Sequence, residues 1–136
     1  MPSEPDEKVK SMPEGKPVIM YVDDDHDYCE AMRVILEAAG YEMAEAASAE
    51  DGLEVYKSRR PDLVIVDLMM EEVDSGTAFV KELRLLGNTA PIYMLSSVGE
   101  GMSISADYAS MGLDGIFQKP IDRATLLTVL KTKLGR

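Results

Sequence analysis

Side chains that could take part in phosphoryl chemistry follow four short apolar runs of the sequence. They are Asp23, Asp24, Asp67, Ser96 and Lys119. Three carboxylates placed close together repel one another, and a divalent cation between them relieves that repulsion. Mg²⁺ suits such a place, because it prefers oxygen ligands, needs few carboxylates and accepts a phosphoryl oxygen as a further ligand. A carboxylate beside the ion can act as a nucleophile, while a hydroxyl and an ammonium group bind the transferred oxygens.

The apolar runs alternate with segments of helical periodicity, and this alternation predicts the elements that position those side chains. The expected strands cover residues 18–22, 42–46, 63–66, 92–95 and 115–118. Helices are expected after each strand: from a capping pair of Asp27 and Glu30 to Gly40, from Ser48 to Arg59, around a face of Phe79, Leu83 and Leu86, around residues 104–111, and from a cap at Asp122 onward.

Five strands that alternate with five helices predict an α/β fold with a doubly wound, mostly parallel sheet covered on both faces. In such a sheet, ligands bind at the edge formed by the carboxyl ends of the strands. Because the acidic, hydroxyl and lysine side chains each follow an expected strand directly, all of them are expected at that one edge.

The composition limits the kinds of protein that this chain can be. Its 136 residues suffice for one sizeable core, and residues 1–16, rich in Pro, Glu, Lys and Ser, are expected to form a flexible tail. A formal charge of −11 argues against direct binding of nucleic acid. With a single cysteine, Cys29, and no secretory signal, a cytoplasmic location is expected. No apolar run approaches the roughly 20 residues of a membrane span.

Four stretches of the sequence resemble the receiver domains of two-component response regulators. They are V-D-D at 22–24, D-L-V-I-V-D-L-M-M at 62–70, P-I-Y-M-L-S at 91–96 and Q-K-P at 118–120. Each stretch alone is a weak signal, but their order and separation are those of the family. The resemblance covers residues 17–134 and implies a receiver domain at residues 17–136, with five helices around a sheet of strand order 2-1-3-4-5.

The resemblance also implies a metal site. Asp24, Asp67 and the backbone carbonyl of Met69 would be direct ligands, and Asp23 would bind mainly through water. The implied cofactor is Mg²⁺ or Mn²⁺, held by oxygen ligands of the kind that Mg²⁺ prefers.

For the phosphoryl group, the resemblance implies Asp67 as the phosphoacceptor, Ser96 as the switch hydroxyl and Lys119 as the phosphoryl-binding lysine. The peptide bond before Pro120 would be cis, a form that bonds to proline tolerate.

The sequence departs from the common receiver pattern at the position that couples phosphorylation to output. Ile116 stands three residues before Lys119, where receivers usually carry an aromatic switch residue. The adjacent Phe117 is out of phase, because side chains along a strand alternate between faces. We therefore expect activation to work through the loop at residues 97–102 and the helix at residues 104–111. The loop after Asp67 also differs, with Glu71 at a position that is usually proline.

The implied function is that of a phosphorelay component. A histidine kinase or phosphotransfer protein, or a small phosphodonor, would supply the phosphoryl group, and the modified domain would control binding of an unknown downstream protein. Such a domain catalyses only its own phosphotransfer and slow self-dephosphorylation. If the chain is complete, it is a stand-alone receiver similar to chemotaxis regulators; a domain cut from a longer regulator would look the same.

Three alternatives stay open at this stage. A pseudo-receiver would use the same fold for binding alone, although such proteins usually lose an acidic residue or the lysine. A Mg²⁺-dependent phosphohydrolase would use the D-x-D of Asp23 and Asp25 but would need further segments to enclose a substrate. A flavodoxin-like cofactor carrier would need a phosphate cradle after the first strand, where the acidic residues repel phosphate.

Overall fold

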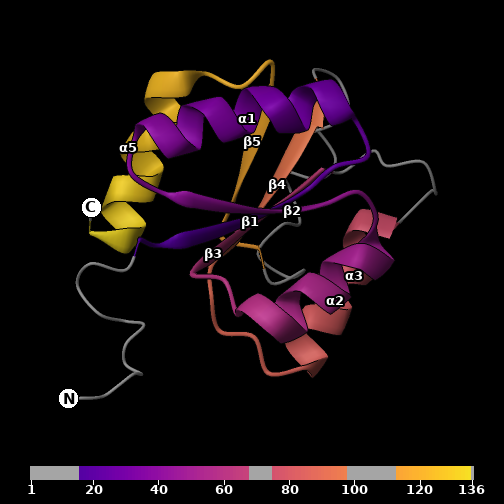
Figure 1. Ribbon diagram of the computed structural model, residues 1–136. Helices are drawn as coiled ribbons and strands as arrows, with labels where there is room; N and C mark the ends of the chain where they lie inside the picture. The colour runs from indigo at the N-terminus through magenta and orange to yellow at the C-terminus, as the bar shows by residue number, and fades with distance from the viewer. Residues whose placement is uncertain (1–15, 68–74, 98–112, 136) are drawn as a thin grey trace.

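Five parallel strands form a single sheet in the computed structural model, which describes residues 16–67, 75–97 and 113–135 (Figure 1). The strand order is β2-β1-β3-β4-β5. The strands are β1 (Val18–Val22), β2 (Glu42–Ala46), β3 (Leu63–Asp67), β4 (Ile92–Ser97) and β5 (Gly115–Lys119). The predicted sheet, with its parallel pairing and its strand order, is confirmed.

Helices cover both faces of this sheet. They are α1 (His26–Ala38), α2 (Ala49–Arg59), α3 (Ser75–Leu85) and α5 (Arg123–Leu134). Helices α1 and α5 lie on one face, and α2 and α3 lie on the other (Figure 1). The helix expected around residues 104–111 lies outside the described residues. Of the expected N-terminal tail, only Lys16 is described. None of the helices in the described ranges is long and apolar enough to cross a bilayer.

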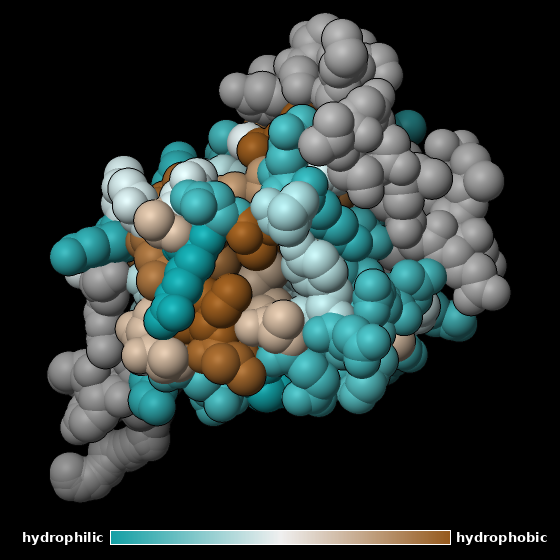
Figure 2. Space-filling model, turned by 90° about the horizontal axis from the view of Figure 1, so that it is seen from above, coloured by the Kyte–Doolittle hydropathy of each residue, from teal (hydrophilic) through white to brown (hydrophobic). Residues whose placement is uncertain are grey.

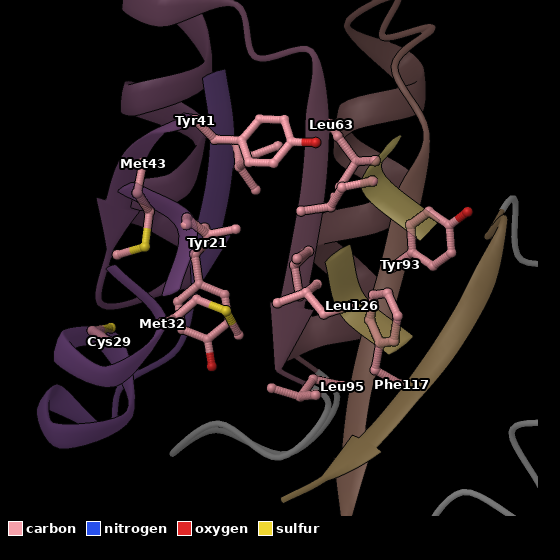
Figure 3. Packing of buried hydrophobic residues seen from close by; sticks show 14 residues of the cluster. Tyr21, Cys29, Met32, Tyr41, Met43, Leu63, Tyr93, Leu95, Phe117 and Leu126 are labelled. Atoms are coloured by element: carbon pink, nitrogen blue, oxygen red, sulfur yellow. The ribbon is translucent and has the colours of Figure 1, made fainter. Parts of the chain in front are cut away.

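The alternation of side chains along β1 explains why the sheet is covered on both sides. Ile19 and Tyr21 pack into the core under α1 and α5, and Met20 and Val22 pack into the core under α2 and α3. The first of these cores contains Met32 of α1 and Leu126 of α5, both labelled in Figure 3 with their aromatic neighbours. Strand β3 is buried at every position, as its continuous apolar run predicted.

The start of α1 differs from the predicted cap. The helix begins at His26, and its N-cap is Asp25, whose side chain accepts a hydrogen bond from the backbone N–H of Tyr28. Asp27 therefore lies in the first turn, where a carboxylate interacts favourably with the helix dipole. The predicted pair of Asp27 and Glu30 was wrong by two residues, because two aspartates at this spacing offer equally good caps in the sequence.

The other caps follow the prediction. Ser48 accepts a hydrogen bond from the backbone N–H of Asp51, and Asp122 accepts one from that of Thr125. On α3, Phe79 and Leu83 are buried as expected.

Leu86 was expected on the buried face of α3, but the residue is 41% exposed. The helix ends at Leu85, and Gly87 then turns the chain with a positive φ of 90°. Beyond Leu85 the chain is not helical, so helical spacing no longer predicts whether a residue such as Leu86 is buried.

Candidate functional site

Three aspartates from two neighbouring strands meet at the carboxyl edge of the sheet. Asp23 and Asp24 follow β1, and Asp67 is the last residue of β3, which pairs with β1. Ligand atoms of the three carboxyl groups all lie within 4.8 Å of one another, so the group could hold a metal ion. Asp23 and Asp67 are buried, whereas Asp24 is exposed. The expected convergence of the carboxylates at one edge is thus present in the structure.

Asp23 is fixed by hydrogen bonds from three neighbours. Its side chain is fully buried, and the residue is 1% exposed. The Tyr21 hydroxyl donates to Oδ2 at 2.5 Å, and the backbone N–H of Asp25 donates to Oδ1 at 3.0 Å. The Cys29 thiol donates to the Asp23 carbonyl at 3.4 Å. Both carboxylate oxygens are therefore already used within the protein, which fixes the orientation of this side chain.

Asp67 is 2% exposed and faces both a like and an opposite charge. Burial, together with the nearby charge of Asp23, raises the pKa of its carboxyl group to about 7, although Lys119 acts in the opposite direction. A cation at this edge would favour the ionised form of Asp67, which is the form that can act as a nucleophile.

Lys119 reaches the same edge from the end of β5. Its Nζ lies 3.3 Å from Oδ1 of Asp67 and 3.6 Å from Oδ2 of Asp23. Partial burial lowers the pKa of this lysine, but the two carboxylates outweigh burial and the pKa is raised overall. Nζ also lies 4.6 Å from the centroid of the Tyr28 ring. The lysine is therefore a charged group within reach of anything that binds to Asp67.

Ser96 lies in β4, between the strands that carry Asp67 and Lys119. It is 1% exposed, and its Oγ is the one buried side-chain oxygen or nitrogen without a hydrogen-bond partner among the described residues. Leaving such a group unsatisfied costs about 1–3 kcal/mol. Because β4 lies between the strands that end in Asp67 and Lys119, a buried hydroxyl without a partner near its end is suited to binding an oxygen of an incoming group.

The donor set fits a hard divalent cation. All three acidic side chains offer oxygen atoms, and the exposure of Asp24 leaves space for the waters that Mg²⁺ retains. Met69, whose carbonyl was expected to be a further ligand, lies outside the described residues. So do residues 98–112, which include most of the loop and all of the helix expected to carry the response.

The end of β5 has the predicted alternation. Phe117 is buried on the α1 and α5 side, where its ring stacks on that of Tyr93 with the centroids 5.1 Å apart (Figure 3). Ile116 is partly buried and packs against the core on the opposite face. The peptide bond between Lys119 and Pro120 is cis, as expected.

Two tyrosines that contact the site were not singled out from the sequence. Tyr21 could have been found, because it stands two residues before Asp23 and strand side chains at that spacing share a face. Tyr28 carried no comparable signal. Its contact with Lys119 joins the first helix to the last strand, which are far apart in the sequence.

Comparison with known proteins agrees with this arrangement. The family model of the response regulator receiver domain matches residues 19–131. The chain is 32% identical over 121 residues to the transcriptional regulatory protein ZraR of Salmonella typhimurium, a match that covers 89% of this chain and 27% of ZraR. It is 31% identical over 122 residues to the DNA-binding dual master transcriptional regulator RpaA of a Synechocystis species, covering 88% of this chain and 50% of RpaA.

Solved structures give the same result. The chemotaxis protein CheY4 of Vibrio cholerae is 28% identical with a TM-score of 0.78, over 87% of this chain and 98% of that one. A CheY-like receiver domain protein of Methanospirillum hungatei is 26% identical with a TM-score of 0.80, over 89% and 95%. The chain spans about a quarter to a half of the length of the curated relatives it matches. With the fold, the acidic edge and the family match in agreement, the chain belongs to the receiver domain family of two-component response regulators.

Proposed function

We propose that this receiver accepts a phosphoryl group on Asp67 in a reaction that depends on Mg²⁺, or on Mn²⁺ in its place. The observation that carries the proposal is the convergence of three carboxylates with a lysine and a buried hydroxyl at one edge of the sheet. The alternatives of a pure binding module, a phosphohydrolase and a flavin carrier account for that combination less well.

The proposed metal ligands are Asp24, Asp67 and the carbonyl of Met69. Asp24 is exposed and Asp67 ends its strand beside it, so both can turn a carboxylate oxygen toward one ion. Asp23 is proposed to act through water, because both of its oxygens already accept hydrogen bonds from Tyr21 and Asp25. When bound, the cation would offset charge on the phosphoryl group and favour the ionised form of Asp67.

In the proposed reaction, a carboxylate oxygen of Asp67 attacks the phosphorus atom of the donor. The bond from phosphorus to the donor breaks, and the leaving group takes its electron pair; with a phosphohistidine donor this is the P–N bond. The ammonium of Lys119, 3.3 Å from Asp67, would bind one phosphoryl oxygen. The hydroxyl of Ser96 would donate to another and would thereby gain the partner that it now lacks.

The proposed phosphodonor is a histidine kinase or a phosphotransfer protein, which we infer from the family and from the surface of α1. Val34 is 68% exposed on this helix, and Ala31 and Ala38 are exposed on the same side of it. Seen from the side on which α1 and α5 both lie, hydrophobic residues gather within a hydrophilic surrounding (Figure 2). An exposed apolar surface suits a protein partner. We further propose that phosphorylation controls binding of a downstream protein and that the protein acts in the cytoplasm.

A phosphodonor assay tests the proposal. The protein is incubated with acetyl phosphate and Mg²⁺, and its intact mass is measured. We expect one added phosphoryl group in the wild type, none in Asp67→Asn and none with a chelator. Asp27→Asn, which changes an exposed aspartate outside the cluster, is the matched control and should be labelled like the wild type. Labelling of Asp67→Asn at the wild-type level would refute the proposal, and continuous release of phosphate without a stable adduct would favour a phosphohydrolase.

A further inference from the structure

Tyr28 joins three parts of the site. It lies in the first turn of α1, where its backbone N–H donates to Oδ1 of the cap residue Asp25 at 3.2 Å. Its hydroxyl accepts a hydrogen bond from the backbone N–H of Ile121 at 2.9 Å, across 93 residues of sequence. Its ring lies beneath the ammonium of Lys119 at 4.6 Å. Tyr28 thus contacts the loop after β1 through its backbone, and the loop after β5 and Lys119 through its side chain.

The ammonium of Lys119 lies further from the two carboxylates than in the shortest ion pairs. Hydrogen bonds between an ammonium and a carboxylate are usually about 2.7–2.9 Å long. Nζ stands further off than this, at 3.3 Å from Asp67 and 3.6 Å from Asp23. The face of the Tyr28 ring attracts the same ammonium through its quadrupole, well within the distance of about 6 Å at which cation–π contacts form.

We propose that Tyr28 is a positioning residue: it orients the ammonium of Lys119 for contact with the phosphoryl group. Its ring holds the ammonium beside Asp67 and keeps it from forming the shortest possible ion pair with either carboxylate. Its hydroxyl fixes the ring to the backbone that follows Lys119. A lysine has a flexible four-carbon side chain. Because the ring already restricts its conformations, less conformational entropy is lost when the ammonium binds a phosphoryl oxygen. This inference rests on the proposed function.

The alternative role for Tyr28 is ordinary packing. The residue is partly buried and packs against the core under α1 and α5, so any large apolar side chain could meet that need. Leucine and methionine fill similar space but offer no aromatic face, while phenylalanine keeps the face and loses only the hydroxyl. These three substitutions therefore distinguish a packing role of Tyr28 from a role in positioning Lys119.

The test compares Tyr28→Leu, Tyr28→Met and Tyr28→Phe with the wild type. The rate of Asp67 labelling by acetyl phosphate is measured at saturating Mg²⁺, and the Mg²⁺ dissociation constant is measured by calorimetry. We expect labelling to slow by about fivefold in the leucine and methionine variants, from the loss of a partly buried cation–π contact, and to stay within about twofold of wild type in Tyr28→Phe. The Mg²⁺ dissociation constant should not change in any of them, because Lys119 is not a metal ligand.

A matched control is available on the opposite face of the sheet. Arg60 lies over the ring of Tyr56 at 5.1 Å, so Tyr56→Met removes the same kind of contact away from the acidic edge. We expect wild-type labelling in this variant. An equal loss of rate in Tyr56→Met and Tyr28→Met would overturn the inference, because it would report a general effect of losing a ring.

NMR provides a readout that does not need phosphorylation. The ε-protons of Lys119 should be shifted upfield by the ring in the wild type and in Tyr28→Phe, and should return toward ordinary values in Tyr28→Leu or Tyr28→Met. No upfield shift in the wild type overturns the inference even if the other variants do not fold. Labelling of Tyr28→Leu at the wild-type rate overturns the role of Tyr28 but leaves the proposed function standing. Absence of labelling in the wild type overturns both.

Discussion

The ammonium of Lys119 lies 3.3 Å from Oδ1 of Asp67, although the strands that carry them are not neighbours. Strand β4 lies between β3 and β5, and the lysine side chain crosses its end to reach the aspartate. Asp67 pairs with Leu95 and Lys119 pairs with Ser97, so Lys119 lies two residues further along the sheet than Asp67, and its long side chain spans this offset. The group proposed to bind the phosphoryl oxygens is thus already next to the proposed phosphoacceptor.

The raised pKa of Asp67 predicts a pH-dependent cost to stability. The folded protein holds the proton more tightly than the unfolded chain, since the pKa rises from 3.8 to about 7. The stabilisation from this proton is complete below the unfolded value and is lost as the pH rises through the folded value. Without metal, Asp67→Asn should therefore be more stable than the wild type at about pH 8, by on the order of a few kcal/mol, and similar to it at about pH 4.

Urea unfolding in the presence of a chelator at both pH values checks this expectation. Asp27→Asn serves as the control, and its unfolding free energy should stay within about 1 kcal/mol of the wild type at each pH. The account of Asp67 is wrong if Asp67→Asn and the wild type keep the same difference in unfolding free energy across this range.

Asp24→Ala should abolish stabilisation by Mg²⁺ while the fold persists. Removing one of three converging carboxylates relieves repulsion, so the metal-free variant should be at least as stable as the wild type. At a Mg²⁺ concentration of about 100 times its dissociation constant, the wild type should gain about 2.7 kcal/mol and the variant almost nothing. Thermal melts with and without Mg²⁺ measure both, with Asp27→Ala as the matched control. A full gain in Asp24→Ala would remove this residue from the ligand set.

Ser96→Ala should separate stability from phosphoryl binding. The hydroxyl is buried without a partner, so its removal should leave the unfolding free energy unchanged or raise it by up to about 1 kcal/mol. Binding of the phosphoryl mimic beryllofluoride should weaken by about tenfold, since a hydrogen bond to a charged group is lost. Calorimetry with Mg²⁺ and beryllofluoride gives the second quantity. Destabilisation by more than about 1 kcal/mol would mean that this hydroxyl has a partner within the protein.

Ile116 leads us to expect an unusual route of output. Isoleucine is stiff at χ1 and has no ring to rotate, and its neighbour Phe117 is held in a stack with Tyr93. On addition of beryllofluoride, the largest changes in NMR shifts or hydrogen exchange should fall on residues 97–111, with Gly99 and Gly101 as candidate pivots. Changes centred on Ile116, with residues 97–111 unaffected, would contradict this expectation.

Much of the site could be predicted because it depends on where strands end. Asp67 and Lys119 each follow a strongly apolar run, and the rule that ligands bind at the carboxyl edge of a parallel sheet brings them together without knowledge of the packing. The cap at Asp25 was missed because the choice between Asp25 and Asp27 depends on backbone angles. The contact of Tyr28 with Lys119 was missed because its prediction requires the relative placement of α1 and the loop after β5.

The proposed chemistry is tested most directly by chemical trapping. An acyl phosphate on an aspartate side chain is reduced by borohydride to homoserine, which marks the modified position in a peptide map. After incubation with acetyl phosphate and Mg²⁺, we expect homoserine at position 67 in the wild type, none in Asp67→Asn and none when a chelator is present. Homoserine at position 23 or 24, or no homoserine in the wild type, would contradict the assignment of Asp67 as the phosphoacceptor.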